Sequence, residues 1–190
     1  NPQIVYSANT TDPVTGMPAT EWFAFGGPAV LSSGTGATRL GYLLTGWLDA
    51  ATQTQYALGA TIPALTDNMS LLAVWEPAPF VVTYLPGAAG VTNMPANALT
   101  VLFGSTYTVS GVVPVRDGFT FTGWGTTGVT GAAQTYASGA TFAMPANNVV
   151  LSANWVADLS PVIYHPNGGT GVAYTEGTHA TLSLVTVAEN

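Results

Sequence analysis

Apolar and polar residues alternate along most of the chain, and this pattern predicts β-strands rather than helices. In residues 149–155 every second side chain belongs to one apolar face (Val, Leu, Ala, Trp), and residues 69–75 repeat the arrangement. Successive side chains of a strand point to opposite faces, so such a segment buries one face and exposes the other. Pro-Gly, Asn-Gly and Gly-Gly steps, as at 86–87 and 167–169, supply turns. A short helix or turn is expected at most near 96–103, so the sequence predicts a mainly β fold.

The sequence also repeats itself. Residues 113–124 match residues 36–47 in an Arg-x-Gly-…-Gly-Trp pattern, 77 positions apart. The matched residues are Arg39, Gly41, Gly46 and Trp47 in the first copy and Arg116, Gly118, Gly123 and Trp124 in the second. Further along, residues 56–61 match residues 136–141 at a spacing of 80 positions. Collinear matches of this kind predict tandem structural units.

A third copy begins after the second and lacks the Arg-x-Gly block. Residues 162–170 resemble residues 82–90, and the chain stops at Asn190. We therefore expect small β modules in tandem: module 1 over residues 1–77, module 2 over 78–158 and a partial module 3 over 159–190. Prolines at the boundaries fix φ and favour short, stiff linkers. A unit of this size buries only about 60% of its unfolded surface, so packing against neighbouring modules or other chains is expected to add stability.

Of all features of the composition, charge says most about which partners and which location the protein can have. Only 6% of the residues are charged, the two cations are arginines, and the formal net charge is −7. Such a chain lacks the cations that phosphates require, which argues against nucleic acid as a partner. The apolar runs are short and interrupted, so no membrane span is expected. The absence of cysteine does not fix the compartment, but a surface of Thr, Ser, Asn, Gly and Ala with almost no Lys or Arg suits an extracellular or cell-surface protein.

Three blocks of the sequence carry a family resemblance. They are VIYHPNGG at 162–169, PVRDGFTFTGW at 114–124 and MPANNVVLSANW at 144–155. These blocks resemble the Listeria–Bacteroides repeat, also called the internalin B-repeat family. The first unit departs from the family pattern, because it lacks the leading proline and has Leu43-Leu44 in place of the Phe-x-Phe. The resemblance implies small β-grasp-like modules of bacterial or archaeal surface proteins, which act as stalks, spacers or adhesive segments without enzymatic activity or a cofactor.

The repeated residues are candidates for structural roles. Tryptophan brings a large buried area, so the repeated ones are expected in the core of a unit or at a joint: Trp47, Trp75, Trp124 and Trp155. Each repeated arginine is expected to pair with local carboxylates or carbonyls and to pin the strand that follows, as Arg39 before Gly41 and Arg116 before Gly118. Ligand binding by these arginines is the alternative, because the guanidinium suits bidentate anion recognition. No catalytic, cofactor or metal site is predicted.

Other residues are candidates for contact with partners. Trp22 has no tryptophan counterpart in the second unit, which favours an exposed aromatic or an intermolecular contact. Tyr164, Leu182 and Leu184 lie in the partial module, where Leu182 and Leu184 are expected on one face of a strand. A half module leaves strand edges unpaired. A metal site of His165, Glu176 and His179 on a hairpin is a weaker alternative, because their spacing is not diagnostic.

Three explanations of the partial module are open: a piece of a longer repeat protein, a frayed end, or a module completed by another copy. We favour the last, because strand addition between chains can build a filament. The predicted function is a non-catalytic extracellular structural protein, a tandem β-repeat subunit of a surface filament, sheath or stalk that assembles by strand and edge contacts with other copies of itself. The alternative is an adhesin module that binds a glycan or a host protein through exposed aromatics, with Trp22, Tyr56 and Tyr136 as candidates. A third hypothesis is an accessory domain of a secreted enzyme.

Overall fold

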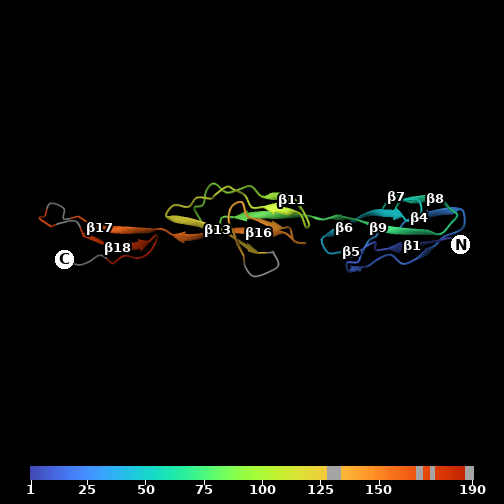
Figure 1. Ribbon diagram of the computed structural model, residues 1–190, viewed down its shortest axis with the longest axis horizontal. Helices are drawn as coiled ribbons and strands as arrows, with labels where there is room; N and C mark the ends of the chain where they lie inside the picture. The colour runs from blue at the N-terminus through green and yellow to red at the C-terminus, as the bar shows by residue number, and fades with distance from the viewer. Residues whose placement is uncertain (128–133, 166–168, 172–173, 187–190) are drawn as a thin grey trace. The chain divides into compact units, whose positions relative to one another are not determined.

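The computed structural model describes residues 1–127, 134–165, 169–171 and 174–186, and no helix occurs among them (Figure 1). The mainly β prediction is confirmed, while the number of repeats stays a prediction. This part of the chain accordingly contains no helix that could cross a lipid bilayer. Two compact units divide the chain. The first comprises Asn1–Phe80, Thr100–Ser105 and Met144–Asn147, and the second comprises Val81–Leu99, Thr106–Ala143 and Asn148–Asn190.

The first unit is built on one mixed sheet. Its strands are β1 (Gln3–Ser7), β2 (Val14–Thr15), β3 (Glu21–Trp22), β4 (Gly27–Val30), β5 (Thr38–Arg39), β6 (Tyr42–Asp49), β7 (Gln55–Ala57), β8 (Thr61–Leu65) and β9 (Met69–Pro77). The sheet order is β2-β5-β6-β9-β1-β3, with β7 paired to β6, and β4 pairs with β8 separately. The parallel neighbours β1 and β9 run from Ile4 opposite Met69 to Ser7 opposite Leu72. A parallel pair requires a long crossover connection, which here contains β2 to β8 in place of a helix.

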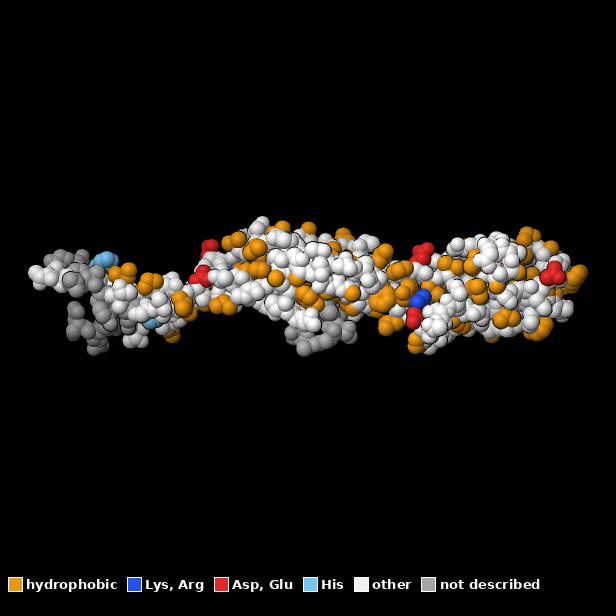
Figure 2. All heavy atoms as spheres, viewed as in Figure 1, with side chains coloured by type: hydrophobic (Ala, Val, Ile, Leu, Met, Phe, Trp, Pro, Cys, Tyr) orange, Lys and Arg blue, Asp and Glu red, His pale blue; other side chains and the backbone are white. Residues whose placement is uncertain are grey.

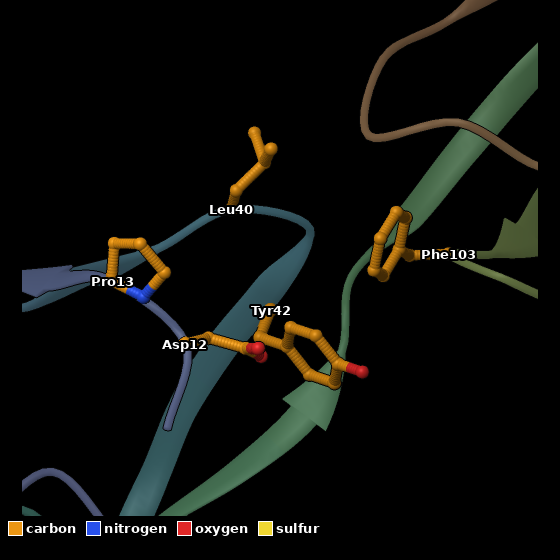
Figure 3. Close-up of a pocket in the computed structure, with 5 residues that line it drawn as sticks. All are labelled: Asp12, Pro13, Leu40, Tyr42 and Phe103. Carbon is orange, nitrogen blue, oxygen red and sulfur yellow. The ribbon is translucent and has the colours of Figure 1, made fainter. Parts of the chain in front are cut away.

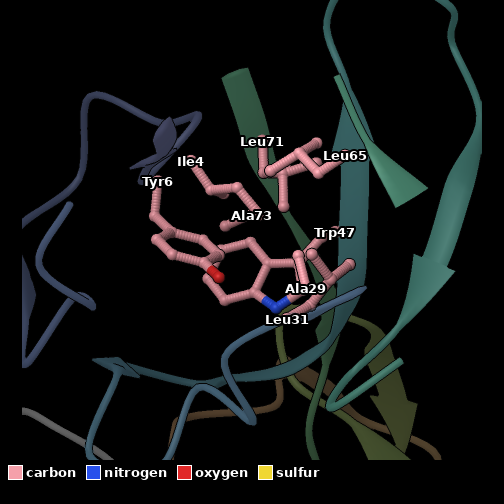
Figure 4. Close-up of a cluster of buried hydrophobic side chains, with 8 residues drawn as sticks. All are labelled: Ile4, Tyr6, Ala29, Leu31, Trp47, Leu65, Leu71 and Ala73. Atoms are coloured by element: carbon pink, nitrogen blue, oxygen red, sulfur yellow. The ribbon is translucent and has the colours of Figure 1, made fainter. Parts of the chain in front are cut away.

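The core of the first unit gathers around Trp47 (Figure 4). Its members are Ile4, Tyr6, Ala29, Leu31, Trp47, Leu65, Leu71 and Ala73. The Trp47 side chain is 0% exposed, and its ring centroid lies 4.7 Å from that of Tyr6. Its Nε1–H donates to the Ser32 carbonyl at 2.8 Å, so the buried indole has a partner for its polar atom.

The second unit repeats the parallel pairing and the tryptophan core. The remaining strands of the chain are β10 (Pro79–Leu85), β11 (Ala98–Leu102), β12 (Thr106–Thr108), β13 (Phe119–Thr127), β14 (Thr135–Tyr136), β15 (Thr141–Ala143), β16 (Val149–Ala157), β17 (Leu159–Tyr164) and β18 (Tyr174–Ala180). The main sheet has the order β11-β10-β16-β13-β14, and β10 lies parallel to β16. Trp124 is 0% exposed, with its ring 4.8 Å from that of Tyr84. Its Nε1 has no hydrogen-bond partner among the described residues, unlike that of Trp47.

A β-bulge precedes the core tryptophan in both units. The register of β6 against β9 shifts between Leu44 and Gly46, and that of β13 against β16 shifts between Phe121 and Gly123. A Cβ at Gly46 would lie 2.7 Å from the Tyr56 carbonyl oxygen, so the close approach of β7 requires glycine there. The Gly-Trp step repeated in the sequence thus marks a bulge that turns the indole into the core.

The strands β17 and β18 form a separate two-stranded sheet. β18 ends at Ala180, and a turn follows in which the Ser183 amide donates to the Ala180 carbonyl at 2.9 Å. The expectation that Leu182 and Leu184 share a strand face is therefore wrong. Leu182 has a φ of 65°, in the left-handed region that a strand does not use, because the chain turns at this point.

Few charges interrupt the surface. Figure 2 shows one face of the molecule, on which apolar side chains are spread over the surface and acidic side chains are few and scattered. The exposed large apolar side chains include Trp22, Phe25, Leu40, Leu99, Leu159 and Leu182. Such side chains are normal when scattered, so the informative ones are those whose equivalents elsewhere in the chain are covered.

Candidate functional site

An Arg-x-Gly-aromatic turn precedes the long strand that carries the core tryptophan in each unit. In the first unit Arg39 ends β5 and lies opposite Tyr42, the first residue of β6. Gly41 has a φ of 78°, a left-handed conformation that glycine adopts without a steric penalty. In the second unit Arg116 and Phe119 form the equivalent antiparallel bridge, and Gly118 has a φ of 74°. We call residues 39–42 the first corner and residues 116–119 the second corner.

The arginine of each corner stacks on the aromatic ring of the same corner. Arg39 Cζ lies 3.6 Å from the Tyr42 ring centroid, and Arg116 Cζ lies 3.5 Å from the Phe119 ring centroid. A guanidinium over an aromatic face is attracted by the ring quadrupole. Arg39 also donates from Nε to Asp12 Oδ2 at 2.9 Å, whereas Arg116 has no carboxylate partner in the described part of the chain. The stacking therefore recurs and the ion pair does not.

Each corner accepts a backbone hydrogen bond from the residue that follows the closing strand. The Ala78 amide donates to the Gly41 carbonyl at 2.9 Å, and the Phe103 amide donates to the Ala78 carbonyl at 2.9 Å. The second unit has the same chain of bonds, from Thr181 to Asp158 and from Asp158 to Gly118, each at 2.9 Å. Backbone bonds of this type do not depend on side-chain identity, so two different sequences build one geometry.

The glycine of each corner makes room for a side chain. A Cβ built on Gly41 would lie 2.5 Å from the Phe103 ring, and one built on Gly118 would lie 2.6 Å from Thr181 Cγ2. Both distances are below ordinary van der Waals contact. The Phe103 ring also meets Tyr42 edge to face, with the centroids 5.3 Å apart. Each corner thus carries one seated side chain, Phe103 in the first unit and Thr181 in the second.

A hollow of about 390 Å³ opens beside the first corner, within the first unit. It is lined by Asp12, Pro13, Leu40, Tyr42 and Phe103 (Figure 3). Most of the lining is apolar, and Leu40 is 79% exposed at its edge. Asp12 is the charged residue of the lining, and it pairs with Arg39. The hollow is therefore an apolar recess next to a built contact, without free catalytic groups.

Trp75 and Trp155 each donate a hydrogen bond to the residue that follows the opening strand of their unit. Trp75 Nε1–H donates to the Ala8 carbonyl at 2.8 Å, and Trp155 Nε1–H donates to the Pro86 carbonyl at 2.9 Å. Both indoles are half-buried, in contrast to the fully buried Trp47 and Trp124. The four repeated tryptophans thus occupy two kinds of position, a central one and a lateral one.

The residues that the sequence predicts to contact partners differ in their exposure. Trp22 on β3 is 66% exposed, and Leu184 is fully exposed. Tyr164 is half-buried at the end of β17. Tyr56 packs against the core of the first unit, and Tyr136 meets Phe142 with ring centroids 5.1 Å apart. Of the three aromatics expected on an adhesive face, only Trp22 is exposed.

The described residues contain no group of three or more acidic or histidine side chains that could hold a metal ion. His165 follows β17 and is exposed, whereas His179 is half-buried on β18. The side chain of Glu176, the third residue of the metal hypothesis, lies outside the described part. Nothing in the described geometry brings these residues together at a site.

Tyrosine hydroxyls form partly buried polar contacts in each unit. The Tyr6 hydroxyl donates to Glu21 Oε2 at 2.8 Å and accepts from the Ser32 amide at 2.8 Å. Burial raises the pKa of Tyr6 to about 12, and the Glu21 carboxylate also raises it. In the second unit the hydroxyls of Tyr84 and Tyr107 lie 3.0 Å apart, and burial raises the pKa of Tyr107. These hydroxyls tie strands together, β1 to β3 in the first unit and β10 to β12 in the second.

One segment of the chain matches a known repeat family. Residues 80–159 match the model of the family described as the divergent InlB B-repeat domain. The matched segment contains the strands β11 to β16, the second corner and Trp124, so these features lie in the part of the chain that is similar to a B-repeat. The first unit shares the corner, the bulge and the tryptophan core with it.

Two curated relatives cover nearly the whole chain. A protein described as "Putative Gly-rich membrane protein" of Evansella cellulosilytica is 28% identical over 183 residues, which cover 87% of this chain and 20% of the relative. Internalin H of Listeria monocytogenes is 26% identical over 193 residues, which cover 93% of this chain and 33% of the relative. The chain therefore spans about a fifth and a third of the length of these relatives. No solved structure matches it.

Sequence reasoning finds the corners but misses what they hold. Arg39, Gly41 and Trp47 recur as identical residues, so comparing the chain with itself detects them. Phe103 and Thr181 occupy the same structural position with different chemistry, so an identity-based comparison passes over both. Both residues directly follow a strand, β11 and β18, and that place is the signal they share.

Proposed function

We propose that this chain is a non-catalytic stalk segment whose B-repeats add length and stiffness to a surface protein. The B-repeat family and the internalin relative indicate a repeat module of a surface protein, in which this fold serves as a repeated unit. The family is one of repeat modules rather than of enzymes. The low charge of the chain, 6% of residues, fits close packing outside the cell better than a mixed-charge cytosolic surface.

The observation that carries the proposal is the pair of identical anchors at the two corners. The linker residues Ala78 and Asp158 each donate to a corner glycine carbonyl and accept from the residue seated in the same corner. A linker without such bonds would behave as a flexible chain, whereas these two are tied at both backbone groups. The recurrence of the same anchor in both units supports a segment that is built of like modules.

The finer part of the proposal is assembly with other copies through strand edges. Among the described strands β17 pairs only with β18, whereas the equivalent strands β1 and β10 each have a parallel partner on the other side. Ile163 on β17 is 50% exposed. β17 has a proline at Pro161 but no lysine, and from Val162 onward no proline interrupts it, so the apolar edge around Val162 and Ile163 is a template for strand addition. Head-to-tail addition of this kind does not close and builds a filament.

Electron microscopy and light scattering of the purified chain test this assembly. We expect filaments that grow with protein concentration, and we expect Ile163→Lys to abolish them, because a charge at the edge opposes strand pairing. The matched control is Val30→Lys, at a residue of similar exposure on β4, which should leave filaments intact. A chain that stays monomeric at millimolar concentration contradicts the assembly.

A second candidate is an adhesin module, favoured by the 66% exposure of Trp22. Exposed tryptophans stack on sugar rings through their apolar face, in the way they stack on other flat apolar surfaces. A glycan array probed with the chain and with Trp22→Ala tests it. Binding that the substitution removes would support the adhesin, and an array without signal would leave the stalk as the function.

A further inference from the structure

The side chain seated in a corner belongs to a position that occurs three times in the chain. The Gly26 amide donates to the Leu65 carbonyl at 2.8 Å, and the Gly104 amide donates to the Met144 carbonyl at 2.9 Å. These two bonds define the same turn, which makes Phe25 the equivalent of Phe103. The turn after β18 repeats the position at Thr181. Phe25, Phe103 and Thr181 are therefore one structural position in three settings.

The side chains of Phe103 and Thr181 are covered by a corner, whereas that of Phe25 is not. Phe103 lies on Gly41, and Thr181 lies on Gly118. Phe25 is 72% exposed, and no corner of the described chain lies over it. A large aromatic that is left in water while its equivalent is seated marks a contact surface rather than a random exposed residue.

We infer that Phe25 is a docking residue for the Arg-x-Gly-aromatic corner of another B-repeat. The corner offers a glycine without a Cβ, an aromatic ring for an edge-to-face contact and a guanidinium stacked behind it, as Phe103 finds at Gly41 and Tyr42. Both corners in the described part of the chain are already filled, so the corner that receives Phe25 belongs to another repeat.

A neighbouring residue adds to the contact surface. Trp22 on β3 is 66% exposed, three positions before Phe25. The equivalent position, three before Phe103, is Thr100. Residues 22–25 therefore present two large exposed aromatics, where residues 100–103 present one seated ring and a threonine. This inference rests on the proposed stalk function and names the partner surface that a stalk segment of this family offers.

A duplicated protein tests the inference with the whole chain present. Residues 1–158 are placed directly before Asn1 of the full chain, so that Asp158 of the added copy stands at the linker position in front of Asn1. This keeps the spacing that relates Asp158 to Leu159 and Ala78 to Pro79. The second corner of the added copy then has Phe25 as the side chain in reach. Because the chain contains no cysteine, introduced cysteines are the only thiols.

The first readout is disulfide formation between Phe119→Cys of the added copy and Phe25→Cys of the full chain. The matched control is the pair Tyr42→Cys and Phe103→Cys, whose rings are in contact within the first unit. The mismatched control replaces Phe25→Cys by Val30→Cys, at another exposed residue. We expect the test pair to form a disulfide at a rate comparable to the matched control. A rate no faster than that of the mismatched pair overturns the inference.

The second readout needs no cysteine. In the duplicated protein the Phe25 amide should donate to the Asp158 carbonyl of the added copy, as the Phe103 amide donates to Ala78. Hydrogen exchange at Phe25 should then slow by at least about tenfold relative to the single chain. The Leu31 amide, which donates to Ala60, serves as the folding control and should exchange equally in both proteins. Unchanged exchange at Phe25 beside unchanged exchange at Leu31 also overturns the inference.

These readouts are independent of filament formation. A single chain that stays monomeric, together with a fast Phe25 cross-link in the duplicated protein, contradicts edge assembly and supports docking. Filaments of the single chain without the cross-link support edge assembly and contradict docking. The failure of one proposal is therefore distinguishable from the failure of the other.

Discussion

In the first unit the corner glycine, Gly41, faces a phenylalanine ring, while in the second unit Gly118 faces the small side chain of Thr181. The first corner adds an ion pair between Arg39 and Asp12, which the second corner lacks in the described residues. The backbone hydrogen bonds are nevertheless the same in both, at 2.9 Å. The comparison teaches that glycine and the backbone define the corner, and that side chains set how strongly it holds.

The largest expected effects lie in the two tryptophan cores. Trp47→Ala and Trp124→Ala should each lower the free energy of unfolding by about 3–5 kcal/mol, because each removes a fully buried side chain. Substitution by phenylalanine is expected to lower the stability by different amounts at the two sites. Trp47→Phe also breaks the bond to the Ser32 carbonyl, so it should cost about 1–3 kcal/mol more than Trp124→Phe. Urea unfolding followed by tyrosine fluorescence and circular dichroism measures both, and equal costs of the two phenylalanine variants would contradict this account.

Next come the corner glycines. Gly41→Ala places a Cβ against the Phe103 ring at a positive φ, so we expect a loss of about 2–4 kcal/mol of stability. Gly118→Ala should cost about 1–2 kcal/mol, since the Thr181 side chain can rotate away. Gly59→Ala is the control, because Gly59 has a positive φ and open space around it. Thermal unfolding of the three variants tests the order, and a Gly41 variant no worse than the Gly59 control would break the comparison of the corners.

Alkaline pH distinguishes the tyrosine contacts of the first unit. The pKa of Tyr6 is raised to about 12 by burial first and by Glu21 second, so its neutral form is favoured in the folded state. The corresponding stability is fully present below the ordinary tyrosine pKa of about 10 and is lost as pH rises towards about 12. Tyr6→Phe should flatten this part of the stability profile at the cost of the bonds to Glu21 and Ser32. Urea midpoints measured at several pH values test this, and a variant profile as steep as that of the parent chain argues against it.

The smallest effect belongs to the ion pair. Asp12→Asn should cost no more than about 1 kcal/mol, because Asp12 is 53% exposed and water screens the pair. The cost should shrink in high salt, since exposed pairs are screened. Arg116→Met in the second corner has no ion pair to lose and should show no such salt dependence. Chemical unfolding with and without added salt measures this contrast.

The β content and the unit that resembles the family could be predicted because they rest on identical residues. Trp47 and Trp124 recur with their glycines, and the alternation before Trp75 and Trp155 is regular. These signals are the identity of repeated residues and the alternation of apolar and polar positions, and both can be found in a single sequence. The strand count within each crossover could not be predicted in the same way, since short strands such as β2 and β5 depend on pairing across the sheet.

The seated residues and the turn at Leu182 show why other features of the structure could not be predicted from the sequence. Phe103 and Thr181 share a position by tertiary placement and not by identity. Leu182 stands where Gly26 and Gly104 stand in the other two turns, and it has a φ of 65° against their 68° and 72°. Alternation alone predicts a strand at Leu182, because a leucine gives no local sign that the backbone must turn there. Context outside the local window decides both cases.

The central claim is that each linker is anchored to a corner by the same two backbone hydrogen bonds, and hydrogen exchange measured by NMR tests it most directly. The amides of Ala78, Phe103, Asp158 and Thr181 are the donors. The account predicts that all four exchange at least about a hundredfold more slowly than in an unstructured peptide. Exchange of Ala78 and Asp158 at the unstructured rate, while core amides such as that of Leu31 stay protected, would contradict it.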